Sequence, residues 1–201
     1  MGKRIRAQKI LKILKKHYPD AKITLNYSNN FELLIAVMLS AQTTDVAVNK
    51  VTPSLFRKYK TIKDFANADL KVLENDIKSI GLYKTKAKNI KNTSKIILNK
   101  FDAKVPKTMS ERLTLPGVGR KTANIVLSHA YNIIEGIAVD THVRRLANAL
   151  KLTKEKSPEK IERDLMKLFG KKDWPLVTHL LIAHGRKKEP LVYKLLSEVK
   201  D

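Results

Sequence analysis

The chain has 201 residues, of which 41 are Lys or Arg and 19 are Asp or Glu, so its formal net charge at pH 7 is +22. With 43% hydrophobic residues it is too apolar to be a disordered polyelectrolyte, and with no cysteine it cannot hold a disulfide, a thiolate nucleophile or a cysteine-bound iron–sulfur cluster. An excess of positive charge attracts polyanions, so nucleic acid is the first candidate partner and an anionic membrane surface the second.

Helical periodicity dominates the sequence from its start. Apolar residues recur at helical spacing from Ile5 to Leu14, and Pro19 ends this first stripe. The segment 31–39 follows Asn29 and Asn30, which are good N-cap residues, and is apolar nearly all round, as in a central buried helix. Further helices are predicted, in order, at 45–59, 62–66, 70–80, 84–100, from the 115–119 region to 131, and at 141–150, 158–169, 174–184 and 191–199.

Extended segments with alternating polarity are missing, and 137–139 is too short to seed a sheet. The sequence therefore predicts an all-α protein of roughly ten to twelve helices. Nothing resembling a Gly/Ser linker divides it, so any domain boundary lies among packed helices. The helix at 84–100 contains six lysines and no acidic residue. Such a run is usually a solvated face, but it is also a candidate phosphate-facing surface.

The most informative stretch lies between two predicted helices and contains two of the seven glycines, Gly117 and Gly119. It reads Leu115-Pro116-Gly117-Val118-Gly119-Arg120-Lys121-Thr122-Ala123-Asn124. Glycine permits a positive φ and a close approach of the backbone, so this hairpin can present amide groups beside a helix N-terminus and bind a phosphate. An ordinary turn between helices also favours Pro and Gly, so these residues alone are weak evidence.

The stretch resembles the helix-hairpin-helix of the DNA glycosylase superfamily, and the chain is similar to the endonuclease III family at further motifs. These are Leu39-Ser40-Ala41-Gln42-Thr43-Thr44-Asp45, Gly81-Leu82-Tyr83, Ile137-Ala138-Val139-Asp140-Thr141-His142 and His184-Gly185-Arg186. The resemblance implies a two-lobed, all-α helix-hairpin-helix DNA glycosylase fold. A six-helix barrel would occupy residues 23–133, and residues 1–22 with 134–201 would form a second, discontinuous helical domain.

The resemblance also implies a bifunctional DNA glycosylase/AP lyase of base excision repair that removes oxidised pyrimidines from double-stranded DNA. The amine of Lys121 would attack C1′ of a flipped nucleotide and leave a Schiff base, and loss of a C2′ proton would then break the 3′ phosphate bond. Asp140 would stabilise positive charge on the sugar and assist deprotonation of Lys121. The first turn of a helix suits Lys121, because the helix dipole disfavours an ammonium there. N-capping, the ordinary role of Asp140, is compatible with this function.

Other positions gain roles from the same resemblance. Gln42 would occupy the gap left by the flipped nucleotide, and Leu82 would be an apolar wedge against the opposite strand. The hairpin residues that would contact DNA are Gly117, Val118, Gly119, Arg120 and Lys121. The backbone carbonyls that match a monovalent-cation site (Na+ or K+) of relatives are those of Leu113, Leu115 and Val118.

The chain departs from the family after 184–186, where endonuclease III usually has four cysteines that hold a [4Fe–4S] cluster. Glu189 stands at the first of these positions, so we expect no cluster and no required cofactor. The apolar residues of the tail are predicted to pack where the cluster loop would have been; they are Leu191, Val192, Leu195 and Leu196. Asp140 and His142 could suggest a metal pair, but His142 is interpreted as a structural hydrogen-bonding residue at a helix start. His179 and His184 lack the helical spacing of a zinc site.

The sequence disfavours three alternative functions. A monofunctional mismatch glycosylase would need a carboxylate at Val37 or a tyrosine at Lys121, and a non-catalytic helix-hairpin-helix DNA-binding protein would need neither Lys121 nor Asp140. A membrane-surface protein would show an exposed apolar stripe, and the longest apolar run, 33–39, is too short to span a bilayer. We expect a monomer without membrane association, in the cytoplasm at the nucleoid or in another DNA-containing compartment.

Overall fold

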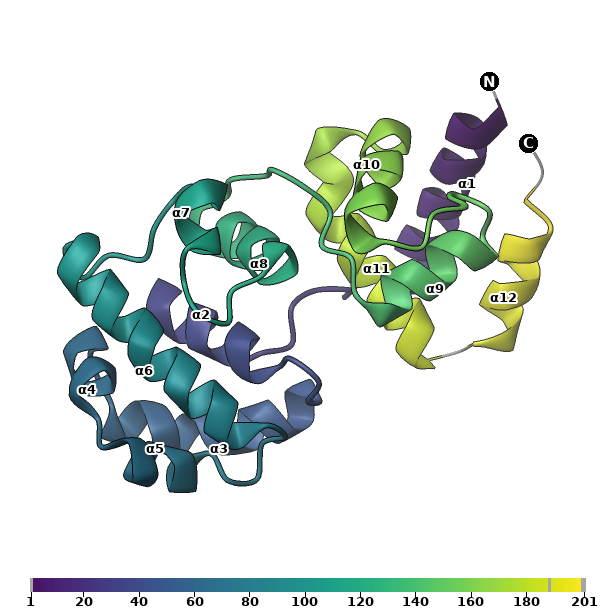
Figure 1. Cartoon of the computed structure of the whole chain (residues 1–201). Helices are drawn as coiled ribbons and strands as arrows, with labels where there is room; N and C mark the ends of the chain where they lie inside the picture. Colours follow the sequence, from purple (N-terminus) through teal and green to yellow (C-terminus); the bar gives the residue numbers. More distant parts are fainter. Residues whose placement is uncertain (1, 188, 200–201) are drawn as a thin grey trace. The chain divides into compact units, whose positions relative to one another are not determined.

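The computed structural model describes residues 2–187 and 189–199, and every regular element in this part of the chain is a helix (Figure 1). This confirms the all-α class. The chain divides into two compact units, Thr24–Ile133 and Met1–Ile23 with Ile134–Asp201. None of the helices in the described ranges combines the length and the apolar character that a membrane span needs.

The unit Thr24–Ile133 is built around α2 (Asn30–Leu39). Every α2 residue from 31 to 39 except Glu32 is buried, as its apolar sequence predicts. The Asn29 side chain caps the helix by accepting the amides of Phe31 and Glu32 at 3.0 and 2.9 Å. The other helices of the unit are α3 (Asp45–Lys58), α4 (Ile62–Asn67), α5 (Leu70–Asp76), α6 (Tyr83–Lys100), α7 (Met109–Leu113) and α8 (Arg120–Tyr131). Helix α2 packs against α3, α6 and α8, and α6 runs along α4 and α5.

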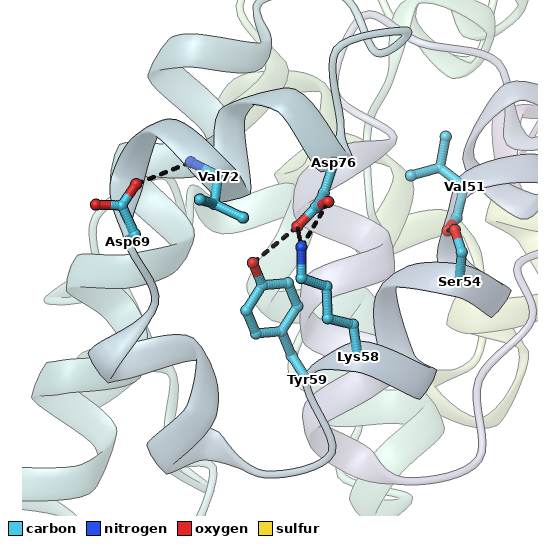
Figure 2. Close-up of polar contacts among 7 residues, drawn as sticks. All are labelled: Val51, Ser54, Lys58, Tyr59, Asp69, Val72 and Asp76. Carbon is cyan, nitrogen blue, oxygen red and sulfur yellow. Dashed lines mark hydrogen bonds and ion pairs between the residues drawn. The ribbon is translucent and has the colours of Figure 1, made fainter.

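A carboxylate joins α3 to α5 (Figure 2). Asp76 accepts hydrogen bonds from the ammonium of Lys58 at 2.7 and 2.9 Å and from the hydroxyl of Tyr59 at 2.7 Å. Burial and the bond to Asp76 raise the pKa of Tyr59 above its ordinary value. The carboxylate of Asp69 begins α5 by accepting the amide of Val72 at 2.9 Å. The contacts of Asp76 tie the end of α5 to the end of α3.

Several helix bounds differ from the sequence prediction, and one helix was not predicted. Helix α5 ends at Asp76 instead of 80, because the amides of Lys78 and Ile80 donate to carbonyls three residues earlier and not four. Helix α11 runs to Lys187 instead of 184. Residues 109–113 form α7, for which no helix was predicted; the Thr108 side chain caps it, and Arg112 is fully buried on it. The Arg112 guanidinium lies 5.4 Å from the Tyr131 ring centroid, and burial lowers its pKa to about 10.

Within the described residues of the second unit, 2–23, 134–187 and 189–199, five α-helices and a short 3-10 helix pack around one core. They are α1 (Gly2–His17), α9 (Thr141–Ala149), α10 (Pro158–Leu168), η1 (Lys171–Asp173), α11 (Trp174–Lys187) and α12 (Pro190–Ser197). The Arg6 guanidinium of α1 donates to the carbonyls of Leu150, at 3.0 Å, and of Val199. The first helix is thus bound to the last turns of the same unit.

The last helix contributes apolar side chains to the core of this unit. Val192 and Leu196 are 0% and 1% exposed and belong to the core of this unit, as predicted for them. Leu195 is half-buried, and the side chain of Leu191 lies outside the described residues. With no cysteine in the chain, the residues present do not fit a [4Fe–4S] cluster.

Candidate active site

The glycine hairpin joins α7 to α8, and residues of α6 pack against it. Gly117 has φ +78°, and a Cβ at this position would lie 2.8 Å from Asn89 Nδ2 and 3.0 Å from Asn89 Cβ. The Thr93 hydroxyl donates to the Pro116 carbonyl at 2.9 Å. Only glycine fits at 117, because the backbone is left-handed there and α6 is in direct contact.

The other glycine of the hairpin faces open space. Gly119 is the N-cap of α8, has φ −90°, and would place a Cβ with no atom within 4 Å. No side chain accepts a capping hydrogen bond from the amides in the first turn of α8. A helix N-terminus with such amides is a good site for a phosphate oxygen.

Lys121 is the second residue of α8 and is exposed. It therefore stands next to the open side of the hairpin. Arg120 precedes it as the first residue of the helix, while Val118 is buried at 5% exposure and anchors the turn. The structure thus brings the predicted hairpin residues into one place, and their roles toward DNA stay predictions.

Asp140 belongs to the other unit and is the N-cap of α9. Its Oδ1 accepts the amide of Val143 at 2.8 Å, and the residue is half-buried. This bond holds the carboxylate in one orientation. The structural role predicted for Asp140 is confirmed, and its pairing with Lys121 stays a prediction.

Gln42 and Leu82 come from segments that lie against each other within the unit Thr24–Ile133. Both have left-handed backbones, with φ +54° and +60°, and both are exposed, Leu82 to 58%. A Cβ built on Gly81 would lie 3.6 Å from Thr43 Oγ1 and 3.7 Å from the Gln42 carbonyl. A large apolar side chain on a protruding turn is the feature that a wedge requires.

The lysine-rich helix α6 is only in part a solvated basic face. Lys84, Lys88, Lys95 and Lys100 are exposed, and Lys91 donates to the Ala68 carbonyl at 2.6 Å. Lys86 is buried, at 6% exposure, so its assignment to the phosphate-facing surface was wrong. The sequence carried a signal for this, because 86, 90, 93 and 97 fall on one helical stripe that the structure buries.

The carbonyls expected to hold a cation lie in the same hairpin. The Leu115 carbonyl accepts the Val118 amide at 3.1 Å, and a second lone pair remains for a cation. The Na+ or K+ site at Leu113, Leu115 and Val118 stays a prediction. Across residues 2–187 and 189–199, no cluster of three or more His, Cys, Asp or Glu side chains could hold a metal.

His184 and His142 both lie against other residues of the second unit. His184 is fully buried; its Nδ1 and the Tyr18 hydroxyl share a hydrogen bond of 2.9 Å, and its ring centroid lies 4.3 Å from that of Tyr193. Burial lowers the pKa of His184 below its ordinary value, and the positive charge of Arg145 lowers it further. The ring of His142 lies against Gly185, where a Cβ would approach its Nδ1 to 2.5 Å.

Comparison with known proteins agrees with this geometry. Residues 35–171 match the family of HhH-GPD superfamily base excision DNA repair proteins. Endonuclease III of Synechocystis sp. is 50% identical over 185 residues, which cover 92% of this chain and 84% of that relative.

Two solved structures are similar along most of the chain. One is a trapped endonuclease III–DNA covalent intermediate, an estranged-adenine complex, with 44% identity, a TM-score of 0.88 and coverage of 92% of this chain and 86% of that one. The other is a non-covalent endonuclease III–DNA complex, with 42% identity, a TM-score of 0.89 and coverage of 94% of each chain.

Proposed function

Because the chain belongs to the HhH-GPD superfamily of base excision DNA repair proteins and matches endonuclease III over most of its length, we propose that it removes oxidised pyrimidines from double-stranded DNA and then cuts 3′ to the abasic site. It is a DNA N-glycosylase with AP lyase activity. The observation that carries the finer proposal is the exposed Lys121 in the first turn of α8, beside an open glycine hairpin.

The reaction begins with a nucleotide flipped out of the stack. The free amine of Lys121 attacks C1′, the glycosidic bond breaks, and the base leaves with the bonding electrons and takes up a proton. Opening of the sugar between C1′ and O4′ then leaves a Schiff base between Lys121 and C1′. Loss of a C2′ proton expels the 3′ phosphate by β-elimination, and water finally releases Lys121.

The other residues bind and orient the DNA. The carboxylate of Asp140 stabilises positive charge that builds on the sugar, and the N-cap bond keeps it oriented. Gln42 fills the gap in the duplex, and Leu82 stacks on the opposite strand. A phosphate binds at the amides of the hairpin, and a monovalent cation on the carbonyls of Leu113, Leu115 and Val118 would offset its charge. The exposed lysines of α6 add affinity that falls steeply with salt.

Borohydride trapping tests the nucleophile. We expect the protein to act as a monomer. On a duplex with an abasic site or thymine glycol, the wild-type protein is expected to form a covalent adduct, and the Lys121→Ala variant is expected to form none. The control Lys63→Ala changes an exposed lysine of α4 and should retain the adduct. An adduct that persists in Lys121→Ala would assign the reaction to another amine. No adduct with the wild-type protein would refute the lyase and leave a DNA-binding protein.

A further inference from the structure

The buried ammonium of Lys86 is bonded on all three of its donors. It donates to the Leu39 carbonyl at 2.8 Å, to the Ala41 carbonyl at 2.6 Å and to the Thr43 hydroxyl at 2.9 Å. Because an ammonium has three N–H groups, these acceptors saturate it and compensate for its lost hydration. Leu39 is the last residue of α2, where carbonyls lack helical partners and the dipole favours a cation.

The acceptors of Lys86 flank the segment expected to enter the DNA. Ala41 and Thr43 are the two neighbours of Gln42, whose φ of +54° is disfavoured for a residue with a side chain. Such conformations persist where surrounding contacts hold them. The amide of Thr43 donates to the Ser40 carbonyl at 3.1 Å, which closes the turn by a bond within the segment. The ammonium of Lys86 adds bonds from another helix to both neighbours of Gln42.

The same lysine is bonded to the second probing segment. Its backbone amide donates to the Leu82 carbonyl at 3.0 Å, in the first turn of α6. Leu82 is the N-cap of α6 and has φ +60°, and no side chain caps the helix there. This backbone bond would form with any residue at 86, so the lysine acts through its ammonium, which ties the segment that carries Gln42 to the first turn of α6, directly after Leu82.

We propose that Lys86 is a positioning residue, which orders the segments 40–44 and 81–83 before DNA binds; this role rests on the function proposed above. Inserting two side chains into a duplex is less costly when their backbones are already ordered. An apolar residue of similar length would fill the space of Lys86 but would leave the carbonyls of Leu39 and Ala41 without a donor. Arginine would not replace it, because a planar guanidinium cannot aim three donors at this set of acceptors.

Hydrogen exchange tests the positioning without reference to activity. Lys86→Met is expected to speed exchange of the amides in 40–44 and 81–86, whereas Lys63→Met, at an exposed residue of α4, leaves them unchanged. If Lys86→Met does not fold, Lys86→Gln provides the comparison, since it keeps an amide donor without the charge. Unchanged exchange in a folded variant would overturn the proposal, whether or not the protein proves to be an enzyme.

Kinetics test whether the ordering serves the reaction. Lys86→Met is expected to lower kcat/KM on a thymine-glycol duplex by about 10- to 100-fold. On a single-stranded abasic oligonucleotide, which has no gap to fill and no opposite strand, we expect a loss below about threefold. In a Gln42→Ala/Leu82→Ala background the further loss on the duplex should be below about twofold, because Lys86 acts through these two residues. Equal losses on both substrates, or additive losses, would mean a purely structural lysine.

The absence of cysteine from the chain permits a chemical rescue. In Lys86→Cys, 2-bromoethylamine converts the one thiol of the unfolded chain into a lysine analogue with sulfur in place of a methylene, and the protein is then refolded. The alkylated protein should regain slow exchange and duplex activity, and the unalkylated variant should not. Failure of the alkylated protein to regain either would overturn the proposal. A wild-type protein without any borohydride adduct would instead refute the proposed function, while the exchange data would still decide whether Lys86 orders the segments.

Discussion

Gly117→Ala perturbs the hairpin at the point where α6 touches it. A residue with a Cβ pays about 1–2 kcal/mol in a left-handed conformation, and φ at this position is +78°. The new Cβ would also lie 2.8 Å from Asn89 Nδ2 and 3.0 Å from Asn89 Cβ. The amide can rotate, but Asn89 Cβ is fixed to α6, so we add an overpacking cost of about 1–3 kcal/mol. The smaller entropy of the unfolded alanine chain returns about 0.4–1 kcal/mol. The net loss in free energy of unfolding is thus about 2–4 kcal/mol.

Thermal unfolding, followed by circular dichroism, measures this loss. For a chain of this size the expected fall in Tm is about 5–15 °C. Gly119→Ala is the matched control, since its Cβ meets no atom within 4 Å and its φ is −90°. Its stability should stay within about 1 kcal/mol of wild type. Its affinity for abasic duplex should nevertheless fall, because the added methyl group stands where the phosphate would approach the hairpin.

A double mutant separates the two costs of Gly117→Ala. Asn89→Gly removes the fixed Cβ as well as the amide, so it should recover the steric part, about 1–3 kcal/mol, and leave the cost of the left-handed backbone. Equal Tm values for the Gly117→Ala and Gly119→Ala variants would refute the reasoning. So would an Asn89→Gly background in which Gly117→Ala is as destabilising as before.

Three further predictions concern the unit that carries the chain termini. Asp140→Asn keeps an N-cap residue, so its Tm should stay almost unchanged while borohydride trapping slows about 100-fold. Asp140→Ala should slow trapping as well and should also lose about 1 kcal/mol of stability. Trapping at the normal rate by Asp140→Asn would contradict the catalytic role. Truncation after Arg186 removes the buried Val192 and Leu196, about 2 kcal/mol each, and should unfold this unit; an unchanged thermal melt would exclude that packing role. Burial lowers the pKa of His184 in the folded protein below its ordinary 6.5. Between the folded and the unfolded pKa, the unfolded chain therefore binds more protons than the folded one. As the pH is lowered through this range, the free energy of unfolding should fall by at most about 1.4 kcal/mol per pH unit. Urea titrations at several pH values should show this slope and a flatter one in His184→Gln; identical slopes would contradict it.

Much of the helical structure could be predicted from local patterns. The apolar segment 31–39 and its Asn29 cap predict α2 because burial on all sides and capping depend on adjacent residues. The short helix α7 was missed because five residues contain too little periodicity, and it is Arg112, buried against Tyr131, that holds it in place. The end of α5 was misplaced for a similar reason, since Asp76 bonds to residues of α3.

The candidate site divides in the same way. The order of the motifs predicts Lys121 and the hairpin glycines, and the structure places these residues together at the start of α8. Lys86 was misassigned because a lysine is nearly always solvated, and its composition-based assignment ignored the stripe on which it falls. Its acceptors on Leu39 and Ala41 are more than forty positions away in the chain and could not be inferred from spacing.

The sequence by itself determined the positive charge, the helical class, the need for glycine at a tight hairpin and the impossibility of a cysteine-bound cluster. These properties follow from composition and from neighbours along the chain. Only the tertiary structure decided that Asn89 closes the space behind Gly117, that Val192 and Leu196 complete a core, and that Lys86 is saturated by buried acceptors. Such contacts join residues distant in sequence, and they exist only once helices pack and exclude water.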